Sequence, residues 1–113
     1  MRLLTTSEIA LLESQACSAE DWARVQITDA PSLKYIRHTR FSGDIRIGAF
    51  TKSFDMPGGI HKHSGLFHAT LHNVTIGDDC CIENIKNYIA NYDIAHDTFI
   101  ENVDTQSRMF FQR

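Results

Sequence analysis

Long apolar segments are missing from this sequence of 113 residues, and no run approaches the ~18 consecutive apolar residues of a membrane-spanning helix. An excess of basic residues is missing too, because 11 Lys and Arg against 14 Asp and Glu give a formal net charge of −3. A chain with this balance has no positive field to attract a phosphate backbone. We therefore expect a protein with no membrane and no nucleic acid among its partners.

Cysteine, proline and glycine are scarce as well. Two prolines and six glycines exclude a collagen-like chain, and 42% hydrophobic residues suffice for one globular domain. Cys80 and Cys81 are adjacent, so a bridge between them would be strained. With Cys17 the number of cysteines is odd. The sequence contains no Cys-x-x-Cys pair of the kind that binds zinc in zinc fingers. We expect three free thiols and, since Thr5-Thr6-Ser7-Glu8 interrupts any signal-peptide core, a cytoplasmic location.

Helical signals are confined to the first part of the chain. Thr5 and Glu8 have the Ser/Thr-x-x-Glu spacing of a capping box, in which the hydroxyl accepts from a backbone amide and the carboxylate reaches back. This pattern predicts a helix over about residues 6–16. Ser18 is a second candidate N-cap, and two acidic residues follow it, so we expect another short helix that ends near Arg24.

The remainder of the chain has the pattern of strands and turns. Residue types alternate over 35–41, the alternation restarts at Ile45, and Pro57-Gly58-Gly59 is the strongest turn signal. We therefore divide the chain into an N-terminal helical cap, residues 1–30, and a β region, residues 31–113.

A sequence repeat is the most informative pattern in the β region. Residues 76–85 align with residues 94–103, and five of the ten aligned pairs are identical. Within this unit an aliphatic or aromatic residue recurs every six positions, at Ile76, Ile82, Tyr88, Ile94 and Ile100. A step of six suits a short strand plus a turn, and three steps complete one triangular coil. The period therefore predicts a parallel β-helix in which Ile stacks on Ile and Asn84 on Asn102 at a corner.

The repeat resembles that of the hexapeptide-repeat proteins, which fold as left-handed parallel β-helices. Lys86 and Tyr88 depart from the pattern, which leaves room for a bulge at residues 86–91. The stretch from Leu4 to about Asp104 is also similar to the N-terminal part of an uncharacterised bacterial family of transferase-like hexapeptide-repeat proteins. The similar segments are Ala19-Glu20-Asp21-Trp22, Arg40-Phe41-Ser42-Gly43, Pro57-Gly58-Gly59-Ile60, His63-Ser64-Gly65-Leu66 and Asn73-Val74-Thr75-Ile76-Gly77.

The resemblance implies a mainly β fold: a left-handed parallel β-helix with 18-residue coils over residues 31–113, preceded by short N-terminal α-helices. Members of that family are longer, and the tail from Gln106 keeps no repeat. The chain is therefore interpreted either as a piece of a longer protein or as a short relative whose tail covers the open coil edge.

The resemblance also implies a function. Proteins of this class are commonly homotrimers, and their best-known activity is acyl transfer, which suggests an acyltransferase-like enzyme using acetyl-coenzyme A or another acyl-coenzyme A. The acceptor would be a small molecule, a sugar or nucleotide sugar. The alternative is a non-catalytic assembly domain or a fragment of a larger protein, because a fold by itself proves no activity. A third interpretation is a zinc-dependent protein similar to carbonic anhydrase.

The candidate site is a group of histidines within residues 61–72: His61, His63, His68 and His72. We predict His63 or His68 as the catalytic general base, because imidazole titrates near neutral pH. The His63-x4-His68 spacing is similar to that of hexapeptide-repeat carbonic anhydrases, but no third histidine stands in that family's flanking motif, so we expect no metal. The competing interpretation is that these rings pack and hydrogen-bond at turns and subunit contacts.

A series of acidic residues follows the repeat: Asp78, Asp79, Glu83, Asp97 and Glu101. The default interpretation is a solvated face at the coil corners, with weak cation binding as the alternative. Stacking Glu83 on Glu101 would cause modest repulsion unless Lys86 or solvent offsets it.

Overall fold

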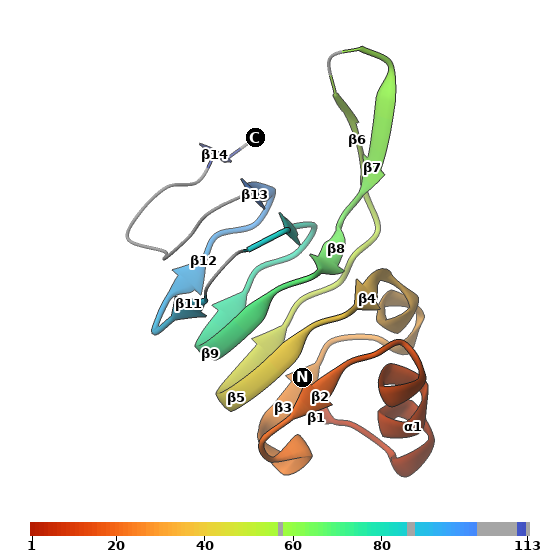
Figure 1. Cartoon of the computed structure of the whole chain (residues 1–113), viewed down its shortest axis with the longest axis vertical. Helices are drawn as coiled ribbons and strands as arrows, with labels where there is room; N and C mark the ends of the chain where they lie inside the picture. The colour runs from red at the N-terminus through yellow and green to blue at the C-terminus, as the bar shows by residue number, and fades with distance from the viewer. Residues whose placement is uncertain (57, 86–87, 102–110, 113) are drawn as a thin grey trace.

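The computed structural model describes residues 1–56, 58–85, 88–101 and 111–112. These residues form short strands with one α-helix and two 3₁₀ helices (Figure 1). In chain order they are β1 (Arg2–Leu3), α1 (Thr6–Ser14), β2 (Ser18–Ala19), η1 (Trp22–Arg24), β3 (Val25–Ile27), η2 (Ala30–Tyr35), β4 (Ile36–Arg37), β5 (Arg40–Ile47), β6 (Ser53–Met56), β7 (Ile60–His63), β8 (Gly65–Phe67), β9 (Thr70–Ile76), β10 (Cys81–Glu83), β11 (Ile89–Ala90), β12 (Asp93–Ile94), β13 (Thr98–Glu101) and β14 (Phe111–Gln112).

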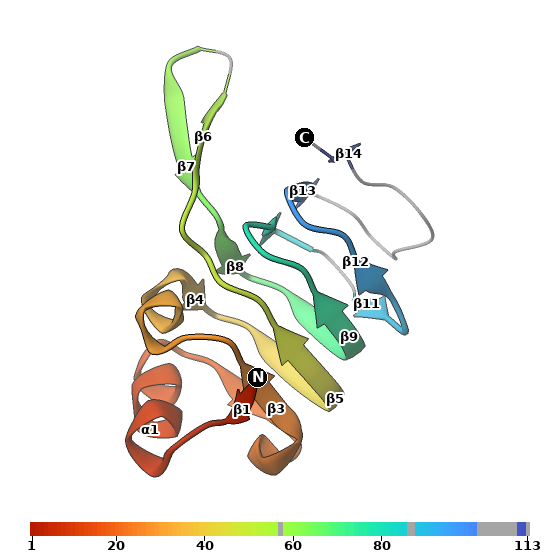
Figure 2. The ribbon, with the colours of Figure 1, turned by 180° about the vertical axis from the view of Figure 1, so that it is seen from behind.

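The strands belong to three sheets. A seven-stranded sheet has the order β1-β3-β5-β9-β11, with β12 also beside β9 and β2 beside β5. A five-stranded sheet has the order β14-β13-β10-β8-β4. The third sheet is the antiparallel hairpin β6–β7, which projects away from the rest of the molecule in both views (Figures 1 and 2). Among the described helices, none has the length and apolar character needed to cross a bilayer.

Strands β5 and β9 form the centre of the main core. Their inward side chains are at most 3% exposed: Phe41, Ile45, Ile47, Leu71, Val74 and Ile76. Leu71 and Val74 both point inward although only two residues separate them, because Asn73 between them adopts a φ of +51° and interrupts the alternation. The facing irregularity on β5 contains Gly43, with a φ of +66°. A residue without a side chain is needed there, since an added Cβ would lie 2.0 Å from Asn73 Oδ1.

The predicted first helix is confirmed as α1. The Thr5 hydroxyl accepts from the Glu8 amide at 3.2 Å, and the Glu8 carboxylate accepts from the Thr5 amide at 2.9 Å, so the capping box is complete. The predicted second helix is wrong at its start. Ser18 lies in β2 and its amide donates to the carbonyl of Thr39, while the short helix η1 takes Asp21 as its N-cap.

The expected left-handed parallel β-helix is wrong. Parallel and antiparallel strands are mixed, and the described strands form no closed or solenoid sheet: β1–β3, β6–β7 and β13–β14 are antiparallel pairs. The 18-residue period does not extend along the chain. Leu66 lies beside both Ile36 and Ile82, so the sequence separation is 66 − 36 = 30 on one side of β8 and 82 − 66 = 16 on the other. Residues 1–30 also contribute strands to the main sheet, so they are more than a helical cap.

Locally, the repeat predicted strand pairing correctly. Ile94 lies beside Ile76 and Ile100 beside Ile82, both in parallel pairs. Asn84 adopts a φ of +53°, as expected of a corner residue. Its predicted partner Asn102 lies outside the described residues, as do part of the predicted bulge and most of the tail. The prediction of three free thiols is confirmed, and all three are buried.

Candidate functional site

His63, at the end of β7, is a half-buried ring with a defined orientation. It lies flat on the ring of Tyr35, with 3.6 Å between ring centroids and 8° between their planes. Its Nδ1 is 2.8 Å from the carbonyl oxygen of Ser64. A carbonyl only accepts, so Nδ1 carries the proton of the neutral ring and Nε2 is its basic nitrogen. This tautomer suits a general base. His63 does not, however, line either of two surface hollows on the outer face of the seven-stranded sheet.

His68 follows β8 and occupies a different corner. It is exposed, has a φ of +55°, and stacks on His38 with 4.5 Å between ring centroids and 4° between planes. The stack follows from the parallel pairing of β4 with β8, since the His68 amide donates to the Arg37 carbonyl at 3.1 Å. Within the described residues no hydrogen bond orients the ring of His68. Of the two predicted bases, His63 is therefore the one whose ring nitrogens have distinct roles.

The other two histidines lie elsewhere again. His61 Nδ1 is 2.5 Å from Asp55 Oδ1 on the exposed part of the hairpin, and His72 lies on the outer face of β9. The predicted cluster is therefore four separate rings with different partners. In the part of the chain that the structure describes, no group of three His, Cys, Asp or Glu side chains is arranged to hold a metal ion. The zinc interpretation has no third ligand there.

His72 forms the one serine–histidine pair of the outer face, as far as the described residues extend. Its Nδ1 is 2.8 Å from the Ser42 hydroxyl, a distance typical of an activated nucleophile. The tautomer of His72, however, does not fit the role of a base for Ser42. The Asn73 carboxamide oxygen accepts from the Asp44 amide at 2.8 Å, so its Nδ2 is the donor facing His72 Nε2 at 3.2 Å. Nε2 therefore accepts, Nδ1 donates to Ser42, and His72 is not the base that a nucleophilic serine needs.

A hollow of about 400 Å³ lies on the outer face of the seven-stranded sheet. Its floor is a row of three outward side chains, one from each of β3, β5 and β9: Gln26, Arg46 and Thr75. The register pairs Gln26 with Arg46 and Arg46 with Thr75. None of the three side chains makes a hydrogen bond to another described residue. This row is therefore available to a ligand.

Arg24 and Asp44 form the rim of this hollow. Arg24 Nε is 3.0 Å from Asp44 Oδ1, and both side chains are exposed. The hydrogen bond from Arg24 and its charge hold the pKa of Asp44 below its usual value, and the charge of Arg46 acts in the same direction. With two guanidinium groups and one carboxylate, the lining is positive by one charge. We call this set of residues the outer hollow.

A second hollow, of about 370 Å³, lies further along the same face. Ser18, Glu20, Arg40, Ser42 and Thr70 are among its lining residues. Its charges cancel, since it contains one arginine and one glutamate. Ser42 of the Ser42–His72 pair lines this second hollow, whereas Asn73, the neighbour of His72, lines the outer hollow.

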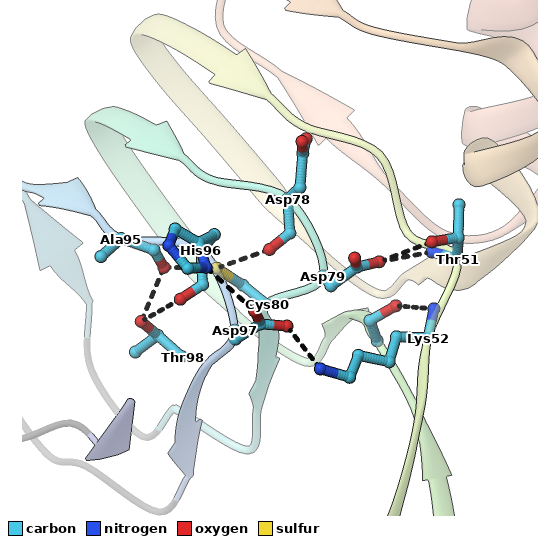
Figure 3. Close-up of polar contacts among 10 residues, drawn as sticks. Thr51, Lys52, Asp78, Asp79, Cys80, Ala95, His96, Asp97 and Thr98 are labelled. Atoms are coloured by element: carbon cyan, nitrogen blue, oxygen red, sulfur yellow. Dashed lines mark hydrogen bonds and ion pairs between the residues drawn. The ribbon is translucent and has the colours of Figure 1, made fainter. Parts of the chain in front are cut away.

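The acidic residues of the repeat have structural partners (Figure 3). Asp79 accepts from the amide and the hydroxyl of Thr51 at 2.7 and 3.0 Å. Asp97 accepts from Lys52 Nζ at 3.1 Å and pairs with His96 at 2.9 Å. Asp78 accepts from the Ala49 amide at 2.9 Å. These carboxylates attach the segment before β6 to the turns of the repeat, so they are neither a simple solvated face nor a cation cluster.

Glu83 and Glu101 differ from the other acids because they are packed beneath the hairpin. Glu83 is buried, with 9% of its side chain exposed, and it forms an ion pair with Lys62 of β7. Glu101 lies beside Glu83 in the parallel pair β10–β13. A hydrogen bond with Glu83, together with burial and the charge of Glu83, raises the pKa of Glu101. The expected repulsion is therefore offset by Lys62; Lys86 lies outside the described residues.

Sequence reasoning missed the outer hollow. Its lining residues come from η1 and from three strands that are separated along the chain. Asn73 and Thr75 lie in a segment that carries the family resemblance, but the resemblance gives that segment no binding role. The alternation of Arg40, Ser42, Asp44 and Arg46 was the available signal, because it marks a polar face of β5. The four histidines are close together in the sequence, but the turns around Gly65 and His68 place their rings apart in space.

Comparison with known proteins gives a family and no described activity. No curated protein and no solved structure matches the chain. The match to a family model extends over residues 1–109, nearly the whole sequence, and the description of that family is a domain of unknown function. The resemblance to transferase-like hexapeptide-repeat proteins therefore stays a prediction, and the chain belongs to the DUF4954 family.

Proposed function

We propose that this domain binds a small anionic molecule that also carries hydroxyl groups, such as a sugar phosphate, in the outer hollow. The observation that carries the proposal is the row of Gln26, Arg46 and Thr75, whose side chains make no hydrogen bond to any described residue. A volume of about 400 Å³ lies within the range of small-molecule sites.

The chemistry of the row supports this class of ligand. Guanidinium groups bind phosphate and carboxylate oxygens in a bidentate manner, and Arg46 has its planar group free for that contact. Gln26 offers a donor and an acceptor, and Thr75 offers a hydroxyl, which suit sugar hydroxyls. Arg24 is held by Asp44 and supplies a second positive charge at the rim.

The binding test is a titration of ¹⁵N-labelled protein with glucose 1-phosphate, followed by NMR. We expect saturable shifts in amides of β3, β5 and β9, weaker shifts of the same amides with inorganic phosphate, and none with glucose. Arg46→Ala should abolish the shifts, and Arg46→Lys should weaken binding because it loses the planar fork.

The matched control is Arg37→Ala, which removes an exposed arginine of β4 that does not line the outer hollow. It should bind as the unaltered protein does. The proposal is refuted if glucose 1-phosphate at millimolar concentration gives no saturable shift, or if Arg46→Ala binds normally.

Group transfer, acyl-coenzyme A as donor and a homotrimeric assembly stay predictions beyond this binding function. His63 is the better-oriented of the two predicted bases, through the bond from Nδ1 to Ser64. Calorimetry with acetyl-coenzyme A, with His63→Ala as the variant, tests the transfer, and light scattering tests the trimer. A cytoplasmic location belongs to the proposal as well, since three free thiols suit a reducing compartment.

A further inference from the structure

The base of the β6–β7 hairpin is attached to β10 and β13 by a small set of side chains. Phe54 of β6 is 3% exposed and packs with Cys81 and Phe99 as a cluster separate from the main core. Its ring meets that of Phe99 edge-on, with 6.3 Å between ring centroids and 89° between planes. Lys62 lies opposite Phe54 in the hairpin register and forms the ion pair with Glu83.

Glu83 and Glu101 are neighbouring acids beside one cation. Their positions are paired directly in the parallel strands β10 and β13, and Lys62 forms an ion pair with Glu83. Carboxylates only accept, so a hydrogen bond between the two groups, which is the first cause of the raised pKa of Glu101, needs one of them to be protonated. Because Lys62 bonds to Glu83, the favoured arrangement has the carboxylate on Glu83 and the proton on Glu101.

We propose that Glu83 and Glu101 form a proton-dependent latch, in which one shared proton and the Lys62 ammonium keep the base of the hairpin seated on β10 and β13. Loss of the proton places two carboxylates side by side. Glu83 then shares Lys62 with the carboxylate of Glu101, and the two negative charges repel each other. The base of the hairpin therefore separates from β10 and β13. This latch is independent of ligand binding in the outer hollow.

The direction of the pH dependence follows from the folded and unfolded states. The pKa of Glu101 is raised by the hydrogen bond with Glu83, so the folded protein holds the proton to higher pH than the unfolded chain does. The stabilisation is complete below the ordinary value of 4.5 and is lost as the pH rises through the raised pKa. The described titratable groups that face the pair are Lys62 of β7 and the Cys81 thiol of β10. The pKa of Cys81 is raised to about 12 by burial, so this thiol stays neutral throughout that range.

The test measures amide hydrogen exchange of β6 and β7 between pH 4.5 and 9, corrected for the intrinsic pH dependence of exchange. We expect protection in the hairpin to fall about tenfold with rising pH, while β5 and β9 show no such change. Glu101→Gln keeps a donor toward Glu83 and cannot ionise, so its hairpin should stay protected across the range. Ser53→Ala is the matched control, because it changes an exposed side chain of β6 without removing an ionisable group, and it should keep the pH dependence.

A second measurement uses the unaltered protein and does not depend on the variants folding. Carbon-13 shifts of the Glu101 side-chain carboxyl group should show a titration above the ordinary value of 4.5. A titration of Glu101 at or below 4.5 would overturn the proposal. A hairpin whose protection is flat with pH, or a slope that persists in Glu101→Gln, would overturn it as well.

Discussion

The central strands β5 and β9 and the hairpin β6–β7 are held in opposite ways. Strands β5 and β9 are paired in six registered positions and bury a continuous row of aliphatic side chains and one aromatic ring against the main core. The described side chains of the hairpin bury only Phe54, and the remaining contacts at its base are polar or stacked: Lys62 with Glu83 and His63 with Tyr35.

This difference separates two kinds of stability within one small domain. Apolar burial involves no titratable group, so the main core around β5 and β9, which we call the body, should unfold as one cooperative unit at any pH that leaves it folded. The hairpin depends on a few ionisable groups, so it can open while the body stays folded. Matched variants in the two regions test this distinction.

The largest effect is expected from Leu71→Ala. Leu71 is fully buried at the centre of β9, and removing three carbons there should lower the free energy of unfolding by about 2–5 kcal/mol. Urea denaturation gives the value. Phe54→Ala is the comparison, since it should raise hydrogen exchange of the hairpin with a smaller loss of global stability. Equal global losses in the two variants would abolish the distinction.

Gly43→Ala should follow, with a loss of about 1–3 kcal/mol. The φ of +66° disfavours a side chain, and the added Cβ would displace Asn73 Oδ1 from the Asp44 amide. Gly58→Ala is the hairpin counterpart. Its φ is +85°, but nothing lies within 4 Å of the added Cβ, so it introduces strain without a clash. Thermal unfolding should show the larger shift for Gly43→Ala, and the reverse order would contradict the model of a crowded body.

Thr5→Ala tests a polar contact of the body. It removes the N-cap of α1 and leaves the Glu8 amide without its acceptor, which should cost about 1 kcal/mol of unfolding free energy. Thr6→Ala, one residue further on, is the control and should be nearly neutral. Chemical denaturation of both variants measures the difference, and a neutral Thr5→Ala would show that the cap is not coupled to the core.

The smallest effect is the acid sensitivity of the N-terminal segment. A hydrogen bond from Arg2 and another from the Thr5 amide lower the pKa of Glu8 to about 2. A lowered carboxyl pKa stabilises the fold above the ordinary value of 4.5, and this contribution is lost as the pH falls toward 2. The effect should be below about 1 kcal/mol, since the pair lies at the surface. Thermal melts between pH 2 and 5 should show a shallower loss for Glu8→Gln, and identical profiles would refute the assignment.

What the sequence could predict depended on how local each feature is. The capping box of Thr5 and Glu8 and the pairing of Ile76 with Ile94 follow from residues close together or one period apart, and both are present. The β-helix was an extrapolation of that period to residues 31–75, where the paired strands lie much further apart along the chain because the hairpin intervenes. A repeat in one part of a chain does not establish the spacing in another.

The candidate site was harder to predict for a related reason. Four histidines close in sequence suggested convergence, but residues with positive φ turn the backbone between them. Three of the rings contact earlier parts of the chain, at Tyr35, His38 and Ser42. The outer hollow, in contrast, joins Gln26, Arg46 and Thr75 through strand register alone. Register is a long-range property, and no short motif encodes it.

The buried thiols have a consequence for the reactivity of the protein. Burial raises the pKa of Cys80 to about 11 and that of Cys81 to about 12, so neither forms the thiolate that alkylating agents and oxidants attack. Cys80 belongs to the main core, whereas Cys81 packs beneath Phe54 at the base of the hairpin. Cys80 and Cys81 thus carry the same thiol group but are buried by different parts of the molecule. The rates at which the two thiols are modified would report separately on transient opening of the main core and of the hairpin base.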